Sequence, residues 1–389
     1  MGDIQKRKVL IATDNFLPRW DGISRFLSEI IPRLSEKYDI TVIAPDFGTY
    51  EDPNIKLIKI PVFKFLKIGD FNIPKFKSKR INDVVKNSDI VFSQTIGPIG
   101  ALAIKASKRY HKPIVSFIHS IEWELVPKAM KSNFLKKYSK IITKRVAKRL
   151  YNKCDLLIMP SQNVVELFIW NNIRTRNKVV NLGVNVDKFK PADEFTRIEK
   201  REKIGIGDKD IVIGYHGRIS REKDLITLLR AFTRIQNNYD DVKLLIVGEG
   251  LKEIKEQLSS RKNVILTGPK NDPVPYLQVM DIYCITSLTE TTCLSLLEAM
   301  SCEVAPISTE VGFIKSYIKN NFNGLFFQKQ NPYHLSKQIE YLIKNPDIRR
   351  KIAKNARATV IERFSWDNTA KGIIDAIEST IELFESKKN

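Results

Sequence analysis

The sequence lacks any apolar run of about 18 residues, the length that a membrane-spanning helix needs. Its first residues, MGDIQKRKVLIATDNF, hold an apolar run too short for a signal peptide and no small-residue cleavage site. Low-complexity segments and short-period repeats are also missing. These absences argue against a membrane-spanning or secreted chain and predict one that is cytosolic or peripherally attached to a membrane.

Cysteine and histidine are both scarce, with four of each. The cysteines form no CxxC pair, and no histidine stands at metal-ligand spacing from them, so we expect reduced, structural thiols; they are Cys154, Cys284, Cys293 and Cys302. The triplet Asp208-Lys209-Asp210 has the form of a metal-binding DxD motif, but it precedes an expected strand instead of following one. We interpret it as a turn and expect no metal site and no cofactor.

Positive charge is abundant and unevenly distributed. Residues 1–185 contain 33 Lys and Arg against 16 Asp and Glu, a net charge of +17, whereas the rest of the chain carries only +4 of the total of +21. This asymmetry predicts a polyanionic partner for the first half, either nucleic acid or an acidic membrane surface.

The length of 389 residues exceeds what one hydrophobic core usually supports, so two domains are expected. Short apolar runs alternate with helical patterns, which predicts doubly wound parallel sheets in an α/β fold. The expected strands of the first half are KVLIAT, DITVIA, DIVFSQ and PIVSFIH, and those of the second half are DIVIGYHG, KLLIVGEG, NVILTG, DIYCITS and VAPIST.

Turn-forming residues in NVVNLGVNVDKFKP interrupt the alternation and mark a domain boundary. We therefore assign residues 1–185 to a first domain and residues 186–365 to a second. The final segment, SWDNTAKGIIDAIESTIELFE, predicts one amphipathic helix with Ile373, Ile374, Ile377, Ile381 and Leu383 on its apolar face.

Ligands of open α/β sheets bind outside the carboxyl ends of the strands, which selects the segments to inspect. After DIYCITS, Thr291 or Thr292 is expected to cap a helix whose first free N–H groups, near Leu294 and Ser295, suit a diphosphate. Glu298 lies inside that helix among apolar residues, so its carboxylate is expected to be buried and to need hydrogen-bond donors. Ribose hydroxyls would serve, and so would a neighbouring lysine or a backbone amide.

Two further segments follow expected strands. Arg218 and Lys223, after Gly214-Tyr215-His216-Gly217, offer two cations for a departing diphosphate, or else belong to a solvated turn. Gly22, after the first strand, would let the backbone approach a phosphate, or simply makes a turn. His119 ends PIVSFIH and either faces the ligand or is a satisfied core histidine.

Residues 128–153 contain ten Lys and Arg and no acid. Apolar residues recur there at helical spacing, with lysines on the other side, namely Phe134, Leu135, Tyr138, Ile141, Ile142, Val146 and Leu150 against Lys136, Lys137, Lys140, Lys144 and Lys148. Upstream, VFKFLKIGDFNIPKFKSKR interleaves Phe63, Phe65, Phe71 and Phe76 with six basic residues. Such a composition predicts an interfacial membrane patch, although an ordinary core contact with a solvated lysine face fits the same pattern.

In order and spacing, these segments resemble the retaining family 4 glycosyltransferases of the GT-B fold. The resemblance covers nearly the whole chain and rests on FLPRWDGISRF, QTIGPIG, MPSQ, NLGVNVDKFKP, GYHGRISREKD, VGEG, FNGLFF, the final FSW, and Glu290 and Glu298. It implies two Rossmann-like domains that face a central cleft, with the helix of residues 366–389 packing back on the first domain.

The resemblance also implies roles for single residues. Glu298 would hold the ribose hydroxyls, Glu290 would touch the donor sugar, and His119 would contact that sugar near the reacting carbon. Arg218 and Lys223 would grip the diphosphate, with backbone at Gly22 and at Leu294-Ser295. A donor phosphate oxygen would take the acceptor proton, so retention would need no paired carboxylates. Departures at Thr292-Cys293, Glu303 and Gly312-Phe313 leave the identity of the sugar open.

We therefore expect a retaining hexosyltransferase with a UDP- or GDP-linked donor and a membrane-lipid acceptor. It would lie in the cytoplasm on the inner face of the cell membrane, held by the patch Lys136, Lys137, Lys140 and Lys144, with no nucleic-acid partner. A soluble sugar or polysaccharide acceptor, or the chemistry of a GT-B nucleotide-sugar epimerase, are the alternatives. A nucleic-acid-binding protein is supported by charge alone and lacks a recognition module.

Overall fold

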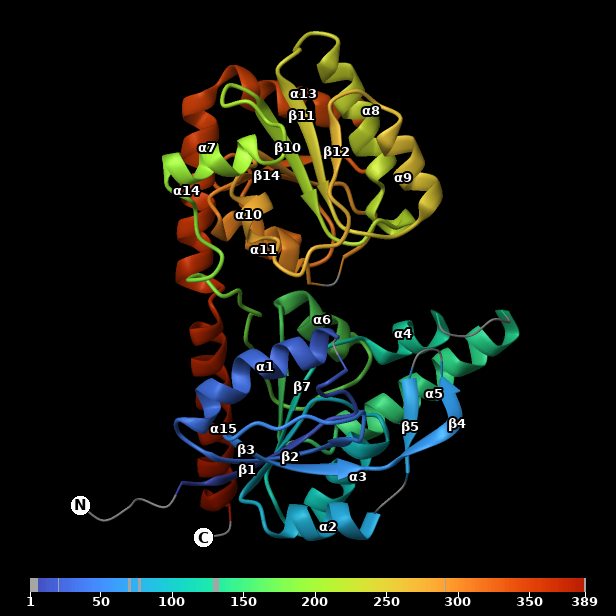
Figure 1. The fold of residues 1–389 in the computed structure, drawn as a ribbon. Coiled ribbons are helices and arrows are strands. Elements are labelled where there is room, and N and C mark those ends of the chain that lie inside the picture. Colours follow the sequence, from blue (N-terminus) through green and yellow to red (C-terminus); the bar gives the residue numbers. More distant parts are fainter. Residues whose placement is uncertain are drawn as a thin grey trace, which may run out of the picture. The chain divides into compact units, whose positions relative to one another are not determined.

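The chain folds into two compact units, shown in a computed structural model (Figure 1). The structure describes residues 6–19, 21–68, 71–75, 78–128, 133–290 and 292–387, with the backbone alone for 64–68, 71–73, 128 and 133. Unit 1 comprises Met1–Asn181 and Trp366–Asn389, and unit 2 comprises Leu182–Ser365. The sequence-based division falls after residue 185, whereas the compact units divide after Asn181.

Unit 1 is built on a seven-stranded parallel sheet with the strand order β3-β2-β1-β6-β7-β8-β9. Its strands are β1 (Lys8–Ala12), β2 (Asp39–Pro45), β3 (Ile55–Ile60), β6 (Ile90–Ser93), β7 (Ile114–Phe117), β8 (Leu156–Met159) and β9 (Asn177–Val179). Most of the central strands are apolar along their whole length because helices cover both faces of such a sheet. A separate antiparallel hairpin joins β4 (Val62–Ile68) to β5 (Phe71–Pro74).

Seven helices are described in unit 1. They are α1 (Gly22–Ser35), α2 (Ser78–Lys86), α3 (Pro98–Arg109), α4 (Glu122–Lys128), α5 (Asn133–Tyr151), α6 (Gln162–Trp170) and α15 (Trp366–Ser386). α15 packs against α1, β7 and β8, and thus joins a late segment of the chain to the first sheet. It buries Ile373, Ile377 and Ile381, whereas Leu383 is exposed and Ile374 is half-exposed. The buried face of α15 is therefore narrower than the apolar face that the sequence predicted.

Unit 2 contains a six-stranded parallel sheet with the order β12-β11-β10-β13-β14-β15. Its strands are β10 (Ile211–His216), β11 (Val242–Val247), β12 (Val264–Leu266), β13 (Ile282–Ile285), β14 (Ala305–Thr309) and β15 (Leu325–Phe327). The helices are α7 (Glu194–Glu202), the short 3-10 helix η1 (Arg221–Lys223), α8 (Leu225–Gln236), α9 (Lys252–Ser259), α10 (Val274–Leu277), α11 (Leu294–Ser301), α12 (Ile314–Tyr317), α13 (Pro332–Lys344) and α14 (Pro346–Arg363).

Both sheets reverse their strand order at one point, between β1 and β6 in unit 1 and between β10 and β13 in unit 2. Connections on the two sides of such a point run in opposite directions, which leaves a crevice outside the carboxyl ends of the strands. The predicted α/β fold with two Rossmann-like, doubly wound units is confirmed. The two reversal points therefore show where each unit would bind a ligand.

Candidate active site

The reversal point of unit 2 brings Lys223 and Glu290 together. Lys223 ends η1 after β10, Glu290 follows β13, and the lysine Nζ donates to Glu290 Oε1 over 2.6 Å. The Ser287 hydroxyl donates to the same oxygen over 2.6 Å, and the Thr286 hydroxyl donates to the Lys223 carbonyl over 2.7 Å. Residues that follow β10 and β13 therefore hold the ion pair in place, and the pair offers a ligand one cation and one carboxylate.

The loop that carries Glu290 is packed tightly against Gly312. Gly312 has a φ of +54°, and a Cβ at this position would lie 2.0 Å from the Glu290 carbonyl oxygen. Any side chain there would force the Glu290 loop to move, so glycine is required by both conformation and space. The sequence pattern marked Gly312 only as a departure from a family motif.

Arg218 has a different environment from Lys223. Its side chain is 72% exposed and forms an ion pair with Glu222 over 2.5 Å. An exposed pair of this kind stabilises the fold little, so the guanidinium group remains available to another anion. The predicted role of Arg218 on a diphosphate remains a prediction.

α11 begins one residue later than the sequence suggested. Its N-cap is Cys293, which makes no side-chain cap, so the expected cap by Thr292 is wrong; Thr291 lies outside the described residues. The backbone at Cys293 has φ −90° and ψ 77°, and its carbonyl accepts the first helical hydrogen bond from Leu296 N. The N–H groups of Leu294 and Ser295 thus belong to the open first turn, where an anion would bind.

Glu298 is buried in α11 with 1% exposure, as its apolar neighbours predicted. Its Oε2 lies 3.5 Å from Nδ1 of His216, the last residue of β10. The Tyr283 hydroxyl donates to the His216 carbonyl over 3.0 Å and so fixes the end of that strand. Sequence reasoning gave His216 no role, because its partner lies 82 positions further along the chain.

At the reversal point of unit 1, His119 is held by Gln94. Gln94 follows β6, and its Oε1 lies 2.9 Å from His119 Nε2. Because Oε1 can only accept, His119 carries a proton on Nε2 and presents Nδ1 as an acceptor. The ring stacks on Phe117 with centroids 4.6 Å apart, and Phe26 meets its edge at 4.7 Å. Burial among these rings lowers the pKa of His119 to about 3, so the ring is neutral near pH 7.

Several buried polar atoms near the carboxyl ends of the unit 1 strands lack a hydrogen-bond partner among the described residues. They are Asn15 Oδ1, Ser24 Oγ, Gln94 Nε2, Glu122 Oε2 and Ser161 Oγ. Buried polar atoms are nearly always paired with protein or water, so a group of orphans at one edge of a sheet indicates a place for a ligand or water. Composition and periodicity gave no signal for these residues.

Gly22 is the first residue of α1, and apart from its chain neighbours and its own helix backbone, no atom of the described residues lies within 4 Å of the position a Cβ would take. The Asp21 carboxylate caps the helix by accepting from Ile23 N and Ser24 N, both over 2.9 Å. The backbone at Gly22 is therefore open, while the next two N–H groups are already satisfied. A phosphate contact at Gly22 remains a prediction.

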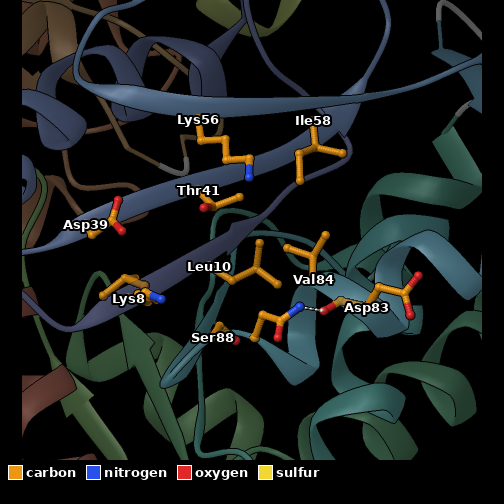
Figure 2. Close-up of a pocket in the computed structure, with 11 residues that line it drawn as sticks. Lys8, Leu10, Asp39, Thr41, Lys56, Ile58, Asp83, Val84 and Ser88 are labelled. Carbon is orange, nitrogen blue, oxygen red and sulfur yellow. Dashed lines mark hydrogen bonds between the residues drawn. The ribbon is translucent and has the colours of Figure 1, made fainter.

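A pocket of about 260 Å³ lies at the opposite end of the unit 1 strands (Figure 2). Lys8 and Asp39, the first residues of β1 and β2, border it together with Val84 of α2. None of the predicted site residues lines this pocket. Because parallel sheets bind ligands at their carboxyl ends, we do not assign the active site to it.

α5 carries the basic segment and exposes both of its faces. Six large apolar side chains are 41–66% exposed, namely Phe134, Leu135, Tyr138, Ile141, Ile142 and Val146, whereas Leu150 is buried. The core-contact interpretation is therefore wrong for residues 134–146 and right for Leu150. Lys136, Lys137, Lys140 and Lys144 are exposed as well. Of the upstream phenylalanines, Phe63 is half-exposed, and the side chains of Phe65, Phe71 and Phe76 lie outside the described residues.

The cysteines and the DxD triplet behave as the sequence indicated. All four thiols are free and buried, and burial raises the pKa of both Cys293 and Cys302 to about 12. Asp208 and Lys209 form a turn before β10, in which Asp210 accepts from Gly207 N over 2.8 Å. Across the described ranges, no group of three or more His, Cys, Asp and Glu side chains could hold a metal ion. In the same ranges, no helix combines the length and the apolar character needed to span a membrane.

Two Rossmann-like units, each with polar side chains gathered at its reversal point, are the architecture of the GT-B class. Two family models match the chain: Glycosyltransferase Family 4 over residues 20–188 and Glycosyl transferases group 1 over residues 196–359. The chain therefore belongs to the family 4 glycosyltransferases and transfers a sugar from a nucleotide sugar. The family resemblance seen in the sequence is confirmed.

Among similar proteins are the alpha-monoglucosyldiacylglycerol synthases of two bacteria. The one from Streptococcus pneumoniae is 24% identical, over 88% of this chain and 79% of that protein. The one from Acholeplasma laidlawii is 23% identical, over 90% of this chain and 91% of that protein. The fold is similar to the crystal structure of Anabaena HepE in complex with UDP, with a TM-score of 0.79, 19% identity, and coverage of 96% and 100% of the two chains.

Proposed function

We propose that this enzyme transfers a hexose from a UDP- or GDP-linked donor to a hydroxyl group of a membrane lipid, with retention of configuration. It would work in the cytoplasm while attached to the inner face of the cell membrane. The observation that carries the proposal is the exposed apolar and basic surface of α5. We call this surface, made of residues 134–146, the α5 face.

The geometry of the α5 face suits an anionic bilayer. At about 100° per residue, its six apolar side chains fall within an arc of about 140°, and the four lysines fill an adjacent arc of about 100°. Exposed apolar groups beside lysines are the features of a helix that lies in the membrane interface. Each basic residue near an anionic surface contributes about 1 kcal/mol, so four lysines contribute enough for reversible attachment.

The relatives support a lipid acceptor and a nucleotide donor. Both bacterial synthases are named for a glucosylated diacylglycerol, and both are matched over most of their length. The HepE structure contains UDP. The net charge of +17 on residues 1–185 adds long-range attraction of the first unit to an acidic surface.

In the proposed mechanism, residues of unit 2 bind the nucleotide-sugar donor. Lys223 and Arg218 would neutralise the departing diphosphate, assisted by the N–H groups of Leu294 and Ser295. Glu298 would hold the ribose, and Glu290 the sugar. The acceptor would attack from the face that the diphosphate leaves, and a donor phosphate oxygen would take its proton. His119 of unit 1 would contact the sugar through its neutral ring.

The test combines membrane binding with product analysis. Liposomes with rising phosphatidylglycerol content should sediment the protein, and rising salt should release it. Changing Lys136, Lys137, Lys140 and Lys144 together to Glu should abolish sedimentation and slow transfer to diacylglycerol in liposomes at least tenfold. NMR of the glycolipid should show the anomeric configuration of the donor.

A matched control separates the α5 face from net charge. Lys203, Lys252, Lys315 and Lys344 of unit 2 have side chains that are 54–86% exposed, and changing them to Glu alters the net charge equally. This variant should bind liposomes nearly as well as the wild type. Equal loss in both variants, or transfer to soluble sugars but never to lipid, would overturn the proposal.

A further inference from the structure

The side chain of Glu122 is anchored beneath the start of α4. Glu122 lies three residues after His119, beyond the carboxyl end of β7. The hydroxyl group of Tyr151, at the end of α5, donates to Glu122 Oε1 over 2.6 Å. Tyr151 is 1% exposed, so the anchor belongs to the core.

The second carboxylate oxygen of Glu122, Oε2, has no partner in the part of the chain that the structure describes. Oε2 is shielded from water, lacks a hydrogen-bond partner among the described residues, and has no cation that affects its pKa. A buried acid is normally paired with a cation or fully hydrogen-bonded, because desolvation disfavours its charge. Burial accordingly raises the pKa of Glu122 to about 7. A group in this state, at the ligand-binding edge of a sheet, is typical of a functional site.

Aromatic rings surround Glu122, and among the described residues no cation affects its pKa. Trp123 of α4 and Tyr151 of α5 both pack against Phe168 of α6, with ring centroids 5.2 and 5.5 Å apart. These aromatic rings make the environment apolar, which strengthens a hydrogen bond to the carboxylate and equally strengthens repulsion of a second anion. A neutral hydroxyl group fits such a place, whereas a phosphate does not.

We propose that Glu122 is an acceptor-binding residue that accepts a hydrogen bond from a hydroxyl group of a neutral polyol headgroup and disfavours a phosphorylated one. The proposal rests on the glycosyltransferase function proposed above and specifies its acceptor class. The Oε2 atom itself is buried, but Ser120, Ile121 and Glu122 as whole residues are half-exposed, so an acceptor can approach this end of α4. Uncharged glycerol and hexose headgroups are the ligands of this class.

The direct test is Glu122→Gln, with Glu124→Gln as the matched control, because Glu124 is an exposed acid on the same helix. Initial rates are measured in mixed micelles with diacylglycerol, glucosyldiacylglycerol and phosphatidylinositol. Wild type should prefer the two neutral lipids by at least about tenfold in kcat/KM. Glu122→Gln should raise KM for the neutral lipids about tenfold, the equivalent of about 1.4 kcal/mol, and leave UDP binding unchanged. Glu124→Gln should match the wild type.

Two further results keep the outcome clear. Should Glu122→Gln fold poorly, Tyr151→Phe removes only the anchoring hydroxyl group and should raise the acceptor KM with the donor KM unchanged. If the wild type is active on free glucose or glycerol but on no lipid, the proposed lipid acceptor is wrong, but the role of Glu122 is still open. Glu122→Gln and Glu124→Gln, measured with the soluble acceptor, would then decide the role of Glu122. An unchanged acceptor KM in Glu122→Gln, or a preference of the wild type for phosphatidylinositol, overturns the inference.

Discussion

Lys223 and Glu290 form an ion pair of 2.6 Å that connects the ends of two neighbouring strands of unit 2. Their side chains are only 21% and 7% exposed, so water screens the pair less than it screens the surface pairs of this chain. The lysine thereby keeps a carboxylate in place before any donor arrives. A diphosphate bound nearby would share that cation, which couples donor binding to the position of Glu290.

Replacing Lys223 should therefore harm both catalysis and stability. We expect Lys223→Met to lower kcat/KM for the donor at least about 100-fold, in line with the loss of one charge-stabilising group. The melting temperature should fall by several degrees, because Glu290 is left buried without its cation. Lys252→Met, at a side chain that is 86% exposed, is the control and should change neither quantity. Steady-state kinetics and thermal unfolding give both readouts, and a fully active Lys223→Met would remove this lysine from the site.

Glu298 offers a test of donor binding that leaves the fold in place. Glu298→Gln keeps the shape of a side chain that is 1% exposed but removes the charge that would accept the ribose hydroxyls. Hydrogen bonds to a charged group contribute about 1.5–3 kcal/mol, so affinity for UDP or GDP should fall roughly 10- to 100-fold. Calorimetric titration measures this loss, with Glu310→Gln, at a 55% exposed side chain, as the control. Unchanged nucleotide affinity would refute the assigned role.

His119 should make the folded state sensitive to acid. Its pKa is about 3 in the fold, against an ordinary value of 6.5, so between these values the unfolded chain binds the extra proton. Stability is therefore lost as pH falls below about 6.5. Between pH 7.5 and 5, the free energy of unfolding of His119→Gln should fall by about 1–2 kcal/mol less than that of the wild type. Urea unfolding of both proteins at each pH measures this difference. An identical pH profile would show that the ring is not held neutral.

Glu122 should make the folded state less stable as pH rises, the opposite of the effect of His119. Its pKa is about 7 in the fold, against an ordinary value of 4.5, so the folded state holds the extra proton between these values. Its contribution to stability is full below about pH 4.5 and is lost as pH rises through 7. Relative to the wild type, Glu122→Gln should gain about 1–2 kcal/mol in going from pH 5 to pH 7.5. Glu124→Gln should show no such relative change.

Activity should survive removal of divalent metal ions. The proposed stabilisation of the leaving diphosphate uses Lys223, Arg218 and backbone N–H groups, all supplied by the chain. Dialysis against EDTA should lower the transfer rate less than twofold. A loss that magnesium or manganese restores would contradict this expectation and would return attention to Asp208 and Asp210.

The sequence predicted much of the fold because its signals were local. Strands β1, β2, β6, β7, β10, β11 and β13 each coincide with an apolar run bounded by polar or turn residues, and the burial of Glu298 followed from its apolar neighbours within one helix. The start of α11 at Leu294, with Cys293 as the N-cap, was missed because a capping preference depends on backbone angles that the sequence alone does not fix.

The sequence could not predict contacts between residues that lie far apart along the chain. Gln94 and His119 are 25 positions apart, and Glu122 and Tyr151 are 29 apart, so only the sheet order brings them together. For α5, helical spacing of Phe134 and Ile142 was equally consistent with a core contact and with exposure. The structure decided between them because Phe134 and Ile142 are 66% and 59% exposed.

The placement of α15 has a consequence for how the protein is made. A ribosome releases β1 to β9 first and then the whole of Leu182–Ser365, and only afterwards the helix that covers the first sheet. Until Ile373, Ile377 and Ile381 have emerged, the surface of β7 and β8 that they cover lies open to solvent. Unit 2, a continuous stretch of chain, can complete its fold during synthesis, whereas unit 1 begins first and is finished last. Shortened chains that stop before residue 366 should therefore accumulate with a folded second unit and an aggregation-prone first one.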